Sequence, residues 1–130
     1  MERYYLITMT LLFAHQIDAA FWHEWDMFFL PGGIQGYVAF NLLAIPFLLH
    51  GYKQVVLGAP QAARFSYICA GLGALTFSIH SAFFGMGFPQ FNLPVSLLVI
   101  LMCLLSSAIL FYKTRQKVDS VIATEYQVHP

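Results

Sequence analysis

Four long apolar segments, separated by breaks that contain proline or glycine, make up most of this 130-residue chain. A helix needs about 20 apolar residues to cross the roughly 30 Å hydrocarbon core of a bilayer. The pattern predicts membrane-spanning helices over residues 4–22, 34–56, 66–87 and 94–112. Because the links between them are short, consecutive helices should be antiparallel neighbours. We therefore expect an all-α polytopic membrane protein, built as an antiparallel bundle of four transmembrane helices.

Composition supports this fold class and excludes others. Hydrophobic residues make up 59% of the chain and charged residues 9%, whereas soluble domains carry about 25% charged residues. So few charges could not cover the surface of a soluble protein of this size. Six basic and six acidic residues balance each other, which leaves no basic footprint for nucleic acid. The expected partner is the lipid bilayer.

The positions of the basic residues predict the orientation of the bundle. Arg3 precedes the first span, Lys53 and Arg64 flank the link between the second and third, and residues 113–117 follow the fourth with three more cations. Four crossings place all of them on one side, which the positive-inside rule assigns to the cytoplasm. We expect a multi-pass protein of a cell membrane, the inner membrane in a bacterium, with both termini cytoplasmic. Residues 1–117 would form the transmembrane domain and residues 118–130 a polar tail.

Small residues inside the spans indicate close packing. Cys69 and Cys103 both fall within predicted spans, where a cysteine behaves as a small packing residue and a disulfide is not expected. Glycines in the third span permit close approach of another helix. They would serve equally well for packing inside the bundle, for a homodimer or for contact with another membrane protein.

Ionisable side chains inside the apolar segments mark a candidate site. His15 and Asp18 lie three residues apart and share a helix face. Counting along the spans at 1.5 Å per residue places His80 at about the depth of Asp18, and Asn41 close to that level. Because an ionisable group at the bilayer centre costs about 2.5–3.5 kcal/mol on insertion scales, it normally faces the bundle interior and has partners. We expect these side chains to meet inside the bundle.

Two imidazoles and a carboxylate are ligands that suit a divalent metal such as zinc. We therefore predict His15, Asp18 and His80 as metal ligands, with a position left open for water or substrate. Such a site supports hydrolysis, and Asp18 and Glu24 are the catalytic candidates. Two alternatives remain open. The same groups could form a proton or cation relay, or they could only fix the packing of a structural or accessory membrane subunit.

Polar residues at the end of the first segment surround the predicted site. If the first helix continues to about residue 27, these polar residues, between Trp22 and Asp26, lie beyond His15 at the outer boundary of the membrane. The acidic members would make the mouth negative and attract cations. With Asn41, the supporting residues are Trp22, His23, Glu24 and Asp26.

A resemblance covers most of the chain. The run from His15 to Phe28, HQIDAAFWHEWDMF, is followed by a Pro31-Gly32-Gly33 turn. It resembles a family of short bacterial membrane proteins of unknown function, in which an N-terminal His-x-x-Asp and a Trp-x-Glu-Trp element precede a Pro-Gly-Gly turn. More distantly it resembles the membrane family marked by His-x-x-Glu-Glu, from which it departs at Asp18-Ala19. The resemblance implies the fold and highlights His15, Asp18, Trp22, Glu24 and Trp25, but it supplies no reaction.

Overall fold

The residues that the structure describes form four long helices and one short helix. The computed structural model describes the backbone of residues 1–29 and 31–128, and the side chains of these residues as far as position 124. The helices in chain order are α1 (Glu2–Phe21), α2 (Glu24–Met27), α3 (Gly33–Val56), α4 (Ala62–Gly85) and α5 (Pro94–Val128). The all-α expectation is confirmed over the part of the chain that the structure describes.

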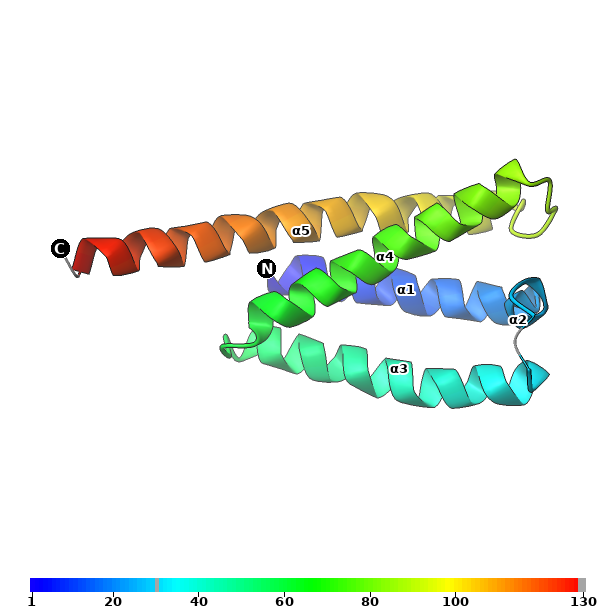
Figure 1. Ribbon diagram of the computed structural model, residues 1–130, viewed down its shortest axis with the longest axis horizontal. Helices are drawn as coiled ribbons and strands as arrows, with labels where there is room; N and C mark the ends of the chain where they lie inside the picture. The colour runs from blue at the N-terminus through cyan, green and yellow to red at the C-terminus, as the bar shows by residue number, and fades with distance from the viewer. Residues whose placement is uncertain (30, 129–130) are drawn as a thin grey trace.

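The long helices lie alongside one another as neighbours in an up-and-down bundle (Figure 1). Helix α1 contacts α3, α4 and α5, and α4 contacts α3 and α5. Within the described residues α3 and α5 do not contact each other, so α1 and α4 lie between them. Helix α4 crosses the bundle obliquely and diverges from α3 toward the end where α2 lies (Figure 1).

Three of the described helices are long and apolar enough to cross a membrane, namely α3, α4 and α5. Helix α1 has 20 residues but does not meet the same criterion, because threonine, glutamine, histidine and aspartate dilute its apolar residues. Large exposed apolar side chains cover the outer faces of these three helices, for example Leu43 at 77% and Val95 at 70%. Such a surface suits contact with acyl chains and not with water.

Tight packing holds the end of the bundle that contains the N-terminus. Tyr5 is fully buried, and its hydroxyl donates a 3.0 Å hydrogen bond to the Leu48 carbonyl oxygen of α3. Gly51 lies against the same tyrosine and against Phe65 of α4, and a Cβ there would overlap the Tyr5 hydroxyl. Since glycine alone leaves room for this approach, α1, α3 and α4 meet closely at this end.

Small residues also bring α4 and α5 together. A Cβ at Gly73 would overlap the Ser107 hydroxyl and would lie 3.0 Å from the Cys103 carbonyl oxygen. Cys69 and Cys103 are both buried free thiols, which confirms that they are packing residues. Gly73 thus serves packing within the chain, whereas a Cβ at Gly71 or Gly85 would meet no atom within 4 Å.

Two helix boundaries differ from the sequence-based expectation in ways that matter. The first helix ends at Phe21 and does not continue to residue 27, because the chain breaks at Trp22 and His23 and restarts as α2. Helix α5 continues well beyond residue 112, to Val128, so the predicted polar tail is helical over residues 118–128. Residues 129–130 of that tail lie outside the described residues.

Candidate functional site

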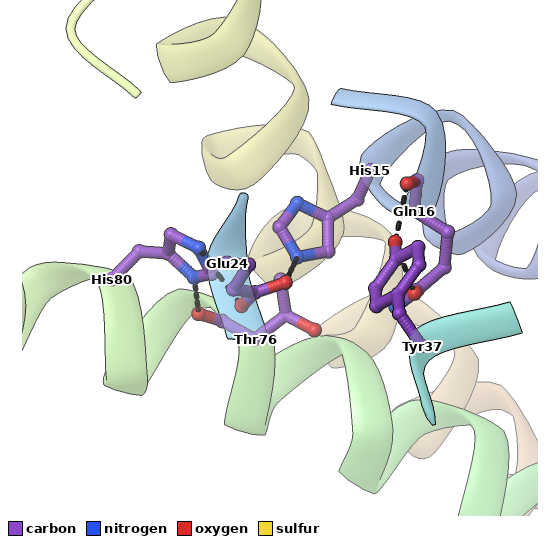
Figure 2. A network of polar contacts seen from close by, with 6 residues as sticks. All are labelled: His15, Gln16, Glu24, Tyr37, Thr76 and His80. Atoms are coloured by element: carbon purple, nitrogen blue, oxygen red, sulfur yellow. Dashed lines mark hydrogen bonds and ion pairs between the residues drawn. The ribbon is translucent and has the colours of Figure 1, made fainter. Parts of the chain in front are cut away.

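Three ionisable side chains from three helices meet inside the bundle. His15 of α1, Glu24 of α2 and His80 of α4 are buried, with 2%, 9% and 6% of their surfaces exposed. The Glu24 carboxylate lies between the two imidazoles (Figure 2), with Oε1 3.4 Å from His80 Nε2 and Oε2 3.9 Å from His15 Nε2. The two imidazole rings also contact each other edge to face, with centroids 4.7 Å apart. We call these three residues the His/Glu cluster.

The break after α1 brings Glu24 to this place. Trp22 closes α1, and His23 adopts a left-handed backbone conformation with φ of 53°. A residue other than glycine rarely adopts this conformation. Because the chain direction changes there, α2 lies beside the end of α1 and turns Glu24 inward. On an uninterrupted helix Glu24 would have stood about 13 Å beyond His15, at 1.5 Å per residue.

The hydrogen bonds of His80 define which of its nitrogens faces the cluster. His80 Nδ1 lies 2.8 Å from the Thr76 carbonyl oxygen (Figure 2). A carbonyl only accepts, so Nδ1 carries the proton, and in the neutral imidazole Nε2 presents a lone pair. His80 Nε2 is buried and has no hydrogen-bond partner among the described residues. This arrangement, in which a carbonyl holds the far nitrogen, is typical of metal-ligating histidines.

Electrostatics make the cluster a place for a cation. Burial and, to a smaller extent, the charge of nearby Asp18 together raise the pKa of the Glu24 carboxyl from 4.5 to about 7. Because the proton of His80 is on Nδ1, an ionised Glu24 would face the lone pair of His80 Nε2 with no hydrogen atom between them. Such a contact between two acceptors is unfavourable in a buried site unless a proton or a metal ion lies there.

The distances fit a metal ion after a small contraction. One ligand atom from each of His15, Glu24 and His80 lies within 4.8 Å of the other two. Zinc binds histidine nitrogen at about 2.0–2.1 Å, so ligand atoms in a tetrahedral site lie about 3.3 Å apart. The His80–Glu24 distance already has this value, and small side-chain rotations would bring His15 into range.

An aromatic side chain covers the cluster from the link between α4 and α5. Phe91 is 3% exposed, and its ring centroid lies 4.3 Å from that of His80 and 5.7 Å from that of His15. It also packs against Trp22, at 5.9 Å. Phe91 has a φ of 63°, an unusual conformation for a phenylalanine, so tertiary packing determines its position. The ring keeps water from one side of the imidazoles.

Two cavities adjoin the cluster. The larger, about 490 Å³, lies among α1, α3 and α4 and is lined by all three cluster residues. A smaller cavity of about 310 Å³ lies between α4 and α5, where Gln90 and Phe91 line it together with His80. His80 therefore lies between two cavities on different sides of α4.

The structure places Asp18 outside the cluster. The sequence predicted His15, Asp18 and His80 as the ligand set, and the structure brings the two histidines together but puts Glu24 between them. Asp18 is partly buried, and its Oδ2 has no hydrogen-bond partner among the described residues. The expectation rested on the face that Asp18 shares with His15 and on its depth relative to His80, whereas the break at His23 brings the Glu24 carboxylate to the histidines.

The other predicted supporting residues separate into two groups. His23 and Asp26 are exposed, with side-chain accessibilities of 66% and 72%, and their polar atoms lie 4.0 Å apart. They lie outside the His/Glu cluster. Trp22 is partly buried against Phe91, and its Nε1 has no partner among the described residues. Trp22 therefore contacts the cover of the cluster and not the cluster itself.

Asn41 belongs to the wall of the larger cavity. Its Nδ2 donates a 3.0 Å hydrogen bond to the Tyr37 carbonyl oxygen, and its Oδ1 is buried without a partner among the described residues. The Tyr37 hydroxyl in turn contacts the Gln16 carbonyl oxygen and lies 2.7 Å from Gln16 Oε1 (Figure 2). These contacts tie α3 to α1 beside the His/Glu cluster.

Sequence reasoning missed three residues of this region. Phe91 gave no signal, because one phenylalanine among 13 in an apolar chain is unremarkable. Tyr37 and Gln16 carried no charge at membrane depth and so did not stand out. The left-handed His23 could have been suspected only from the two tryptophans and two acidic residues around it, which fit poorly on a buried helix.

Comparison with known proteins gives a family but no activity. Residues 1–117 match the model of a family described as "Family of unknown function (DUF6713)". No match was found among curated proteins or among solved structures. The matched range covers α1 to α4, most of α5 and all three residues of the His/Glu cluster.

Proposed function

The chain belongs to DUF6713, a family of unknown function, and we propose that it is a membrane protein whose His/Glu cluster binds a divalent metal ion such as zinc. The observation that carries the proposal is the convergence of His15, Glu24 and His80 in a buried site where His80 Nε2 has no hydrogen-bond partner among the described residues. Two imidazoles and one carboxylate are a common ligand set for catalytic zinc.

His15, Glu24 and His80 would supply three ligands to a zinc ion, which would leave a position for water or substrate, and all three residues line the larger cavity. A water molecule bound there would become a nucleophile at neutral pH, so the proposed chemistry is hydrolysis. With Glu24 as a ligand, Asp18 is the remaining catalytic candidate. Its partnerless carboxylate oxygen would be free to accept a proton.

We further propose that α1 crosses the membrane with α3, α4 and α5. Helix α1 runs alongside the other long helices (Figure 1) and buries Tyr5, His15 and Ala19 against them. Buried neighbours relieve the cost of its polar residues. Four crossings put both termini on one side, which the basic residues assign to the cytoplasm, in the inner membrane if the host is a bacterium.

Metal analysis of the detergent-purified full chain tests the metal site. We expect about one zinc per chain after reconstitution, and loss of at least tenfold in affinity in His15→Ala, Glu24→Gln and His80→Ala. Asp26→Asn, an exposed acid on the same short helix as Glu24, should keep the metal. Asp18→Asn separates the two ligand sets, because it should keep the metal if Glu24 is the third ligand.

The outcomes that contradict the metal site are equally definite. A wild-type protein that remains metal-free after incubation with zinc, cobalt or manganese overturns it. So does a set of cluster variants that keep the metal. If His15→Ala lowers only the thermal stability and leaves metal content unchanged, the cluster has the packing role of an accessory subunit.

A second candidate function is a proton or cation relay. It is favoured by the position of His80, which lines both cavities and has Nε2 free of a partner among the described residues. Liposomes loaded with a pH-sensitive dye measure it. Proton flux that disappears in His80→Ala but persists in Ser81→Ala, an exposed neighbour lining only the smaller cavity, would favour the relay over the metal site.

A further inference from the structure

The larger cavity differs from an ordinary buried pocket in the distribution of its polar residues. Nearly all of them gather at the His/Glu cluster, and they are the six residues of Figure 2. Away from the cluster the walls are apolar, and Asn41 is the one other polar lining residue of the described chain. The apolar part is lined by Leu12, Ala44, Ile45, Leu48, Leu72 and Leu75. We call this part the apolar cleft.

The apolar cleft is elongated along the helices. On α4 it runs from His80 down to Leu72, about two turns or roughly 12 Å. On α3 it continues as far as Leu48, near the tightly packed end of the bundle. The whole cavity of about 490 Å³ falls within the roughly 300–1,000 Å³ range of pockets that enclose one small organic ligand.

The cleft opens sideways between α3 and α4. Phe40 and Ile45 of α3 and Leu75 of α4 line it and are themselves exposed, at 57%, 37% and 53%. The two helices diverge toward the end of the bundle where α2 lies (Figure 1). Both are candidate membrane spans, so the opening faces hydrocarbon. The molecules available there are lipids, and an aqueous solute would have to cross acyl chains to reach it.

We propose that the apolar cleft binds one acyl chain of a membrane lipid, which enters between α3 and α4 and brings the polar head-group region to the His/Glu cluster. The apolar walls of the cleft would contact the acyl chain of the lipid. The polar side chains of the His/Glu cluster would contact the oxygen atoms at the start of the head group. This inference deepens the proposed function by naming the substrate class, and it relies on that function only for what happens at the polar end.

Photo-crosslinking in liposomes tests the occupant. The probe is phosphatidylethanolamine with a diazirine in one acyl chain, incorporated with the full-length protein and mapped by mass spectrometry. We expect labelled peptides to include the cleft wall around Leu72 and Leu75. Ala44→Trp fills the cleft and should reduce this labelling at least fivefold. Leu43→Trp is the matched control, because Leu43 is the adjacent residue but is 77% exposed and does not line the cavity.

The result that overturns the proposal is labelling spread evenly over the outer faces of α3 and α4 and equal in the two tryptophan variants. Thermal unfolding of both variants shows whether Ala44→Trp folds, and Ala44→Leu provides a smaller obstruction with a smaller expected loss. Metal content separates this test from that of the metal site. Ala44→Trp should keep zinc while it loses the label, whereas His80→Ala should lose zinc while the cleft remains labelled.

Discussion

At the scale of single residues, Glu24 is a carboxylate in a buried environment. It is the first residue of the four-residue helix α2, yet it is buried between two histidines that come from long helices. Its raised pKa follows from that burial, and the ionised form is therefore the less favourable one in a folded protein without metal.

We predict that the metal-free protein loses stability as pH rises through about 7. The folded-state pKa of Glu24, about 7, exceeds the ordinary 4.5, so the folded chain retains a proton that the unfolded chain releases. This stabilisation is complete below pH 4.5 and amounts to at most about 3 kcal/mol. Thermal unfolding in detergent with a chelator, between about pH 5 and 8, measures it.

Two variants isolate the contribution of Glu24 to that pH dependence. Glu24→Gln cannot ionise, so its melting temperature should change less across the same pH range. Asp26→Asn should keep the wild-type slope, because Asp26 is exposed. An identical slope in wild type and Glu24→Gln would mean that Glu24 does not titrate in the folded protein as its burial implies.

At the scale of helices, the break between α1 and α2 explains both what sequence reasoning achieved and what it could not achieve. The lengths of the apolar segments and the proline- and glycine-containing breaks between them predicted four long helices, because these signals are local in the sequence. Counting depth along two helices that run in the same direction placed His80 level with Asp18, about one turn from His15, and so brought the two histidines near each other. Glu24, and not Asp18, lies between the histidines because of the backbone conformation of His23. Tertiary packing determines that conformation, and helical periodicity does not predict it.

Also at this scale, the contact between α4 and α5 should depend on one glycine. We predict that Gly73→Ala destabilises the protein by about 1–3 kcal/mol, the usual cost of overpacking, because the new Cβ meets Ser107 and the Cys103 carbonyl oxygen. Gly71→Ala is the matched control two residues away. Its Cβ meets nothing within 4 Å, so it should raise stability by about 0.5–1 kcal/mol.

Chemical unfolding in detergent compares these two variants. The prediction requires opposite signs for the two substitutions. Equal effects would show that the α4–α5 distance can relax around an added methyl group.

At the scale of the whole molecule, the number of crossings decides which side each end faces. The N-terminus and the C-terminal end of α5 lie at the same end of the bundle (Figure 1), as an even number of long helices requires. The sequence supplied the same answer through its basic residues, since Arg3, Lys53, Arg64 and the three cations of residues 113–117 account for all six.

We predict that reporters at both ends of the chain give the cytoplasmic result. Green fluorescent protein should fluoresce when fused to either terminus in bacterial cells, and alkaline phosphatase fused to either should be inactive. Phosphatase inserted in the link between α4 and α5 should be active, which controls for expression. Termini on opposite sides would mean an odd number of crossings, with α1 lying outside the set of spanning helices.

The separation of His15, Glu24 and His80 along the chain has one further consequence. An ion held by all three would cross-link α1, α2 and α4, in addition to the packing contacts that α1 makes with the other two. Closing such loops restricts the unfolded chain more than it restricts the folded one. A chelator would then abolish any metal-dependent activity and would also destabilise the end of the bundle around α2. The opposite end, where Tyr5 and Gly51 pack, would stay folded.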